Sequence, residues 1–268
     1  MLADLRHREF ILVCVVTLVV LAVGHAAELR GEDLTVPIVK DGQTQVVPEF
    51  KNPDHWVRHD LWVETKFDSD GDGTLDRMHV DVTRPRQTDT RRIKLPVILH
   101  CSPYFGGTGI AKPPYLWNVR HELGAPPRAR QRFGPIERKD TRPIISKSYV
   151  NDWVPHGYVV AHSSSPGTGF SQGCPTIGKD NETLAIKAVI DWLNGRAPGY
   201  TTPHGDKPVV AYWSTGKVGM SGVSHPGTFS LAAATTGVDG LEVVIPVAAN
   251  TSPYHYYRSN GLVRHPYG

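Results

Sequence analysis

The stretch from residue 217 to residue 237 constrains the fold of this chain more than any other. Residues 218–220 are an apolar run, residues 222–227 read GVSHPG, and residues 228–236 have the small-residue composition of a helix. The glycines on either side of Ser224 let neighbouring backbone come close without a Cβ clash. Pro226 suits the first turn of a helix, where its missing N–H costs nothing. The stretch predicts a strand, a sharp turn that carries Ser224, and a helix.

A strand, a tight turn with a serine and a helix together present the nucleophile of α/β-hydrolases. The usual spacing is G-x-S-x-G, whereas this chain reads G-x-S-x-x-G, with Pro226 in the place of the second glycine. A serine between glycines, taken alone, is most often only a turn residue. The alternative serine of this stretch, Ser221, falls inside the apolar strand. Ser224 is therefore the candidate nucleophile, lifted above the sheet at the positive end of the following helix.

The composition is that of a globular chain. Of the 268 residues, 40% are hydrophobic and 21% are charged, which is enough for one large core or two domains. The net charge of +3 is too small and too scattered to indicate a nucleic-acid partner.

The N-terminus carries Arg6 and Arg8 and then an apolar run over residues 10–24. This run is shorter than the about 20 residues of a membrane span, and small residues precede a possible cleavage site after Ala26. We expect residues 1–26 to be a signal peptide and the protein to be secreted or periplasmic, without stable membrane insertion. The alternative is an uncleaved N-terminal membrane anchor. Without this segment two cysteines remain, Cys101 and Cys174, which could pair in an oxidising compartment or stay as separate thiols.

Two strand-like runs, residues 55–66 and 77–82, flank an Asp/Gly cluster and predict a hairpin. Asp68, Asp70 and Asp72 have the spacing of a calcium loop with glycine at its sixth position. The twelfth position is His79, where a bidentate glutamate is needed. An Asx-rich turn is therefore the default expectation, and calcium is the alternative.

Further along the chain, apolar runs at 95–99, 157–162 and 241–247 predict buried strands. Helical patterns lie at 146–155 and at 181–193, the latter capped by Asp180 or Asn181. This alternation predicts an α/β fold, a mostly parallel sheet with helices on both faces. Tyr104 follows the first of these strands, where an oxyanion hole would lie, and its O–H could stabilise negative charge. The alternative, which this segment alone favours, is a buried tyrosine in a loop. Residues 108–143 are long, proline-rich and basic, and we expect them to border the mouth of the site.

Several segments together resemble the Xaa-Pro dipeptidyl-peptidases and the related cocaine-esterase-like serine hydrolases. The matching segments lie in the family's order and are SPYFGGTG (102–109), HGYVVAHSSSPGTGFSQG (156–173), AVIDWLNGRAPGYT (188–201), GKVGMSGVSHPGT (216–228), AATTGVDGLEVVIP (from residue 233) and SPYHYYRSNGLV (252–263). The resemblance implies Ser224 as nucleophile, Tyr104 as one oxyanion donor, the backbone N–H of His225 as the other, and Tyr256 in the proline pocket. It also implies a peptide substrate with proline at the second position, and neither a metal nor an organic cofactor.

Departures from the family pattern concern both ends of the chain. His225 stands where the family often has tyrosine, and Pro253 where it often has tryptophan. The expected signal peptide stands in place of the N-terminal helical domain of the family's lactic-acid bacterial members. In this fold the Asp and His of the triad follow the nucleophile. Asp239, His255 and His265 come too early for these roles, and His100, His162 and His225 are not assigned as the base. The chain is thus expected to be the N-terminal portion of an α/β-hydrolase domain, residues 27–268, truncated after the nucleophile helix and one further strand.

The expected activity is the release of Xaa-Pro dipeptides from peptide N-termini through an acyl-enzyme on Ser224. Two alternatives remain open. One is an esterase or acylase that uses the same Ser224 and Tyr104. The other is a secreted hydrolase-like fragment without catalytic activity.

Overall fold

The computed structural model describes residues 36–104, 108–109, 137–138 and 147–263. Backbone contacts divide the chain into residues 1–36 and 37–268, and the fold described below belongs to the second unit. The predicted signal peptide and most of the basic segment 108–143 lie outside the described residues. Among the helices of the described ranges, none is both long and apolar enough to cross a bilayer.

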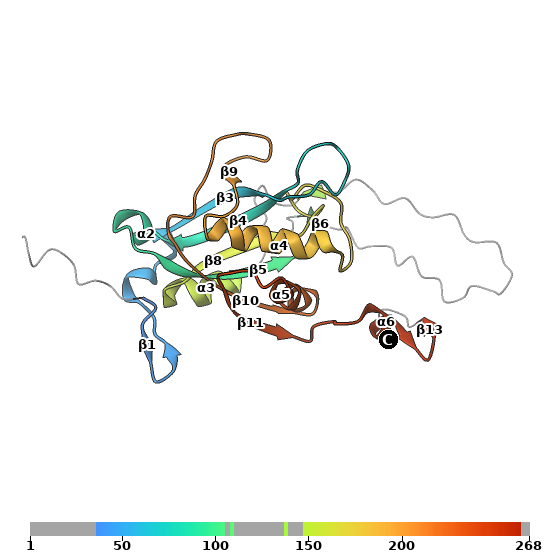
Figure 1. Cartoon of the computed structure of the whole chain (residues 1–268). Coiled ribbons are helices and arrows are strands. Elements are labelled where there is room, and N and C mark those ends of the chain that lie inside the picture. The colour runs from blue at the N-terminus through green and yellow to red at the C-terminus, as the bar shows by residue number, and fades with distance from the viewer. Residues whose placement is uncertain (1–35, 105–107, 110–136, 139–146, 264–268) are drawn as a thin grey trace, which may run out of the picture. The chain divides into compact units, whose positions relative to one another are not determined.

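A seven-stranded mixed sheet forms the centre of the fold (Figure 1). Its strands, in spatial order, are β11 (Leu241–Val247), β10 (Ser214–Val223), β5 (Leu95–Ser102), β8 (Val159–Ser164), β4 (Arg77–Pro85), β3 (Trp56–Glu64) and β9 (Gly199–Tyr200). The four strands from β11 to β8 run parallel, whereas β4, β3 and β9 each pair antiparallel with their neighbour. This is the predicted α/β-hydrolase sheet, a parallel half joined to an N-terminal hairpin.

The remaining elements are short or helical. Helices are α2 (Gln87–Thr90), α3 (Lys147–Trp153), α4 (Asp180–Leu193), α5 (His225–Thr235) and α6 (Pro253–Tyr257), with 3-10 turns η1 (Pro48–Phe50), η2 (Pro53–His55) and η3 (Val154–His156). Two-residue strands pair antiparallel as β1 (Val39–Lys40) with β2 (Gln43–Thr44), β6 (Thr108–Gly109) with β7 (Glu137–Arg138), and β12 (Arg258–Ser259) with β13 (Leu262–Val263).

Helices cover both faces of the sheet, as predicted. Successive strand residues point to opposite faces, so paired residues on neighbouring strands define each face. A cavity of about 210 Å³ between α3 and the strands is lined by Asp81 of β4 and His162 of β8, which are register partners. On the other face α4 and α5 pack together, α5 against β10, β11 and β5. In Figure 1 α4 crosses in front of the strands.

The core between these layers is made of apolar side chains from the central strands and the inward faces of the helices. Its members include Val80, Val82, Val97, Leu99, Val159, Ala161, Ile186, Val189, Ile190, Met220 and Phe229. Leu184 lies outside this core: it is an apolar residue of α4 that is 44% exposed. Asp180 is the first helical residue of α4, and the cap position is Lys179, which makes no side-chain cap bond.

The edge strand β11 differs from the expectation of a buried strand. Val243, Ile245 and Val247 are all exposed on it. An apolar run predicts burial only when both faces of the strand have a covering layer. At this end of the sheet α5 covers one face of β11, and the alternate side chains lie open.

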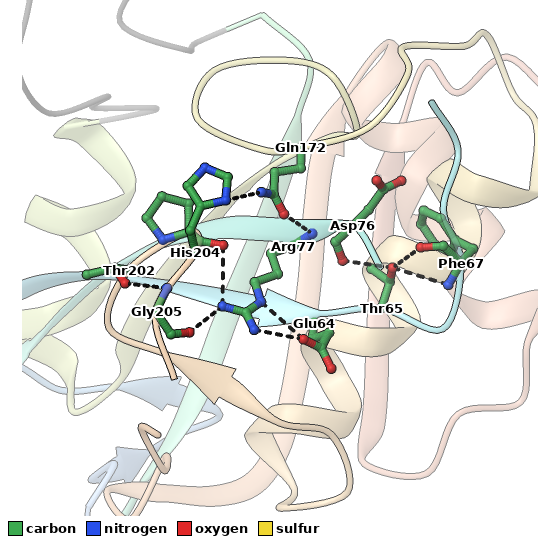
Figure 2. A network of polar contacts seen from close by, with 10 residues as sticks. Glu64, Thr65, Phe67, Asp76, Arg77, Gln172, Thr202, His204 and Gly205 are labelled. Atoms are coloured by element: carbon green, nitrogen blue, oxygen red, sulfur yellow. Dashed lines mark hydrogen bonds and ion pairs between the residues drawn. The ribbon is translucent and has the colours of Figure 1, made fainter. Parts of the chain in front are cut away.

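Arg77 ties three distant segments to the start of β4 (Figure 2). Its guanidinium donates to Glu64 Oε2 at 2.9 and 3.1 Å and to the Gly205 carbonyl at 2.6 Å. The same group lies 3.7 Å from the centroid of the Tyr200 ring. The Arg77 N–H donates to Gln172 Oε1, and Gln172 contacts His204. These contacts fix the hairpin to the loops that follow β8 and β9.

Candidate active site

The turn between β10 and α5 has the strained geometry that the sequence predicted. Ser224 has φ 62° and ψ −124°, in a region that non-glycine residues rarely occupy. Its N–H donates to the Val247 carbonyl of β11 at 2.9 Å, and its own carbonyl accepts from the Thr228 N–H at 3.0 Å. Ser224 is exposed. The hydroxyl therefore stands at the carboxyl edge of the parallel strands, on a backbone held from both sides.

Two glycines make this turn possible for steric reasons. A Cβ at Gly222 would lie 2.5 Å from the backbone carbon of Pro226. A Cβ at Gly227 would lie 2.8 Å from the carbonyl oxygens of both Gly222 and Val247. Real Cβ atoms do not approach backbone so closely, and backbone cannot rotate away as a side chain can. The glycine of the unusual spacing, Gly227, thus performs a packing role although it comes one position late.

The alternative serine lies where the sequence placed it. Ser221 is within β10, and its hydroxyl donates to the Ile245 carbonyl of β11 at 3.3 Å. Ser221 therefore serves the pairing of two strands, which supports the choice of Ser224.

Tyr104 lies beside the turn. Its ring centroid is 6.2 Å from that of His225, edge to face, and its side chain is 59% exposed. The Tyr104 N–H donates to Ser102 Oγ at 3.1 Å, which fixes the start of the loop after β5. The structure thus brings together Ser224, Tyr104 and His225 from two segments far apart in the chain.

His225 opens α5. The first N–H groups of a helix have no acceptor within the helix, and they carry the positive end of its dipole. The His225 amide is therefore suited to receive negative charge beside Ser224, the role that the family resemblance implies for it. Its imidazole packs edge-on against Phe229 at 4.5 Å between centroids, and burial lowers the pKa of His225.

Tyr256 is not joined to this group. It lies exposed in α6, with its ring centroid 4.9 Å from that of Tyr257. Among the described residues no ring contact or hydrogen bond links Tyr256 to Ser224 or Tyr104. Its place in a proline pocket stays a prediction.

His100 and His162 lie within strands rather than in the loops beyond them. His100, expected after the end of its strand, is part of β5 and donates from Nδ1 to the Ser221 carbonyl at 3.0 Å. Burial lowers the pKa of His100. Burial, and then the neighbouring His100, lower the pKa of His162 to about 3. Both imidazoles are enclosed among α3 and the strands, so neither suits a base that must reach the Ser224 hydroxyl.

The acidic hairpin loop has the hydrogen bonds of Asx turns. Asp68 accepts from the N–H groups of Gly71 and Gly73 at 2.7 and 2.9 Å, and Asp72 accepts from Thr74. His79, the twelfth position of a calcium loop, is buried in β4 and contacts Asp60 at 3.0 Å.

The carboxylates that converge in this loop are those of Asp68, Asp70 and Asp76, with one oxygen from each within 4.8 Å of the others. Asp72, which the spacing suggested, is not among them. Asp76 is held by Ser69, whose N–H and hydroxyl both donate to it, and burial raises the pKa of Asp76. These contacts fit the default expectation, an Asx-rich turn.

The two cysteines left after the apolar N-terminal run are separate thiols. Cys101 is buried in β5 and Cys174 is exposed in the loop after β8. Burial raises the pKa of the Cys101 thiol to about 12, so this thiol stays protonated.

Glu182 is a residue of the site that sequence reasoning missed. It lies in the first turn of α4, only 3% exposed, with Oε2 3.9 Å from His225 Nε2. In the sequence it looked like an ordinary acidic residue near a helix N-terminus, where such residues are common. No local signal distinguishes it, because its burial depends on the packing of α4 against α5.

Known proteins resemble this chain over most of its length. Residues 70–268 match the family model of the X-Pro dipeptidyl-peptidases (S15 family). A protein of Rhodopirellula baltica is 64% identical over 240 residues, which are 90% of this chain and 38% of its own length. An Xaa-Pro dipeptidyl-peptidase of Ligilactobacillus salivarius is 35% identical over 91% of this chain and 33% of its own length.

Among solved structures, an α-amino acid ester hydrolase is 19% identical, with a TM-score of 0.45, over 82% of this chain and 29% of its own. The chain spans well under half the length of the relatives that it matches. Because the family model covers most of the chain, the family is established: this chain belongs to the X-Pro dipeptidyl-peptidase (S15) family.

Proposed function

We propose that the protein is a serine hydrolase that releases Xaa-Pro dipeptides from the N-termini of peptides. The observation that carries the proposal is the exposed Ser224, held at φ 62° on a strand-to-helix turn in a chain of the S15 family. Tyr104 beside it and the His225 amide at the start of α5 support the same chemistry. The names of the relatives support the substrate class.

The reaction proceeds by acyl transfer. Ser224 Oγ attacks the carbonyl carbon of the proline residue, and the Ser224 hydroxyl proton passes to a general base. The oxyanion of the tetrahedral intermediate accepts hydrogen bonds from the Tyr104 hydroxyl and the His225 N–H. The C–N bond breaks as the peptide amine takes the proton, and water then hydrolyses the ester on Ser224. We assign no described residue as the general base.

The experiment uses the protein expressed from its complete reading frame and an Xaa-Pro-p-nitroanilide substrate. Ser224→Ala is expected to lower kcat by about a thousandfold or more, because the covalent step is lost. The matched control is Ser221→Ala, three residues upstream, which removes a hydroxyl bound to a strand carbonyl. It is expected to keep kcat within about threefold.

A Ser224→Ala variant with wild-type turnover would refute the assignment of the nucleophile. A wild-type protein that cleaves esters but not Xaa-Pro amides would instead be an esterase or acylase of the same fold. If the wild type cleaves neither substrate and Ser224 does not react with a fluorophosphonate, the chain is a hydrolase-like protein without this activity.

A further inference from the structure

Glu182 is a buried carboxylate that faces the imidazole of His225. Its Oε2 accepts a hydrogen bond from the Gly178 N–H at 2.6 Å. Burial raises the pKa of Glu182. A buried carboxylate is costly unless other groups compensate it. The Gly178 bond alone would be available to an exposed carboxylate at the same helix terminus, so it does not explain the burial.

The group that faces Glu182 from the next helix is the imidazole of His225. The two side chains come from α4 and α5, which pack against each other, and Glu182 Oε2 lies 3.9 Å from His225 Nε2. This separation is longer than a hydrogen bond, but at this distance a carboxylate attracts an imidazolium. On its other sides the imidazole contacts the rings of Tyr104 and Phe229. These three residues are the ion-pair and ring partners of His225 within the described chain.

We propose that Glu182 is a positioning residue that holds the His225 imidazole and, through it, the oxyanion-binding groups. The inference rests on the proposed function, because it concerns the residue whose amide and whose neighbour Tyr104 would bind the oxyanion. A carboxylate that faces one ring nitrogen favours the imidazolium and the ring orientation that keeps this nitrogen near the carboxylate. A fixed imidazole restricts the motion of the first turn of α5 and of the Tyr104 ring that contacts it.

The pairing predicts a measurable effect on the titration of His225 in this 268-residue chain. Histidine labelled with ¹⁵N and ¹³C gives separate resonances, and that of His225 is identified by its loss in His225→Asn. Glu182→Gln is expected to lower the pKa of His225 by about one unit, because it removes a negative charge that favours the imidazolium. The matched control is Asp180→Asn, which removes an exposed carboxylate from the same first turn of α4. It is expected to shift the pKa of His225 by about a third of that or less.

Equal shifts in the two variants, or no shift in Glu182→Gln, would overturn the pairing. The wild-type chain supplies a second measurement that does not depend on whether a variant folds. If the two groups are paired, the His225 resonance shows a second, smaller inflection where Glu182 titrates. A single inflection would also overturn the pairing.

The positioning role is tested separately, in the protein expressed from its complete reading frame. Glu182→Gln is expected to lower kcat for an Xaa-Pro-p-nitroanilide about tenfold with KM within about twofold, because only the transition state is affected. Glu182→Asp, which keeps the charge, is expected to recover part of the loss, and Asp180→Asn to leave kcat unchanged. A wild-type kcat in Glu182→Gln would refute the positioning role. If the wild type cleaves no Xaa-Pro substrate, the proposed function fails, while the His225 titration still decides the pairing.

Discussion

Replacing Arg77 by alanine should destabilise the fold far more than removing an arginine from a surface ion pair. The Arg77 side chain is 13% exposed and that of its partner Glu64 is 22% exposed. Removing Arg77 leaves Glu64 unpaired and the Gly205 carbonyl without its donor (Figure 2). Removing one partner of a buried ion pair costs about 3–5 kcal/mol. Because water can reach part of Glu64, we expect about 2–4 kcal/mol.

The control for this measurement is Arg91, which forms an ion pair with Glu49 at the same 2.9 Å. The two side chains are 51% and 42% exposed, so Arg91→Ala should cost about 0–1 kcal/mol. Urea unfolding followed by circular dichroism gives both values, and Arg77→Ala should lower the midpoint by about 1 M. Arg77→Lys should recover only part of the loss, because lysine cannot bind Glu64 and the loop carbonyls with one planar fork. Equal midpoints for Arg77→Ala and Arg91→Ala would refute the reasoning.

Two further predictions concern the interior and the edge of the sheet. Burial holds the pKa of His162 in the folded protein at about 3, whereas in the unfolded chain this pKa is about 6.5. His162 therefore destabilises the fold increasingly as the pH falls from about 6.5 to 3. His162→Phe should flatten the dependence of the unfolding free energy on pH in this window. The control, His255→Phe at an exposed position, should not. Equal slopes in the wild type and both variants would contradict this prediction. Ile245→Lys places a charge on the exposed edge strand β11 and should reduce self-association of the 268-residue chain in sedimentation velocity with little change in Tm. Glu242→Lys, on the same strand, is the control. Self-association that persists in Ile245→Lys would show that β11 does not form the contact between copies of the chain.

The order of strands and helices along the chain and the sharp turn at Ser224 could be predicted because they depend on local patterns. The period of the apolar residues separates strands from helices, and the glycines around Ser224 permit backbone that other residues resist. Helix α5 nevertheless begins at His225, before the predicted start at residue 228. Composition had suggested the later start, whereas the turn itself places the first helical residue directly after Ser224.

Other features depended on contacts that the local sequence pattern does not reveal. The exposure of Ile245 could not be read from its apolar neighbours, because burial depends on whether a layer covers that face. In the hairpin loop Asp76 joined Asp68 and Asp70 in place of Asp72, because the loop folds back where Ser69 bonds to Asp76.

The sequence by itself determined the class of fold, the turn that bears Ser224 and the family, because each follows from residues that are adjacent or arranged in a repeating pattern. Only the tertiary structure decided that Glu182 faces His225, that Tyr104 lies beside the same imidazole and that Tyr256 packs against Tyr257. The physical reason is the range of the forces involved. Backbone sterics and periodic burial act over a few residues, whereas these contacts depend on how whole helices and strands pack against one another.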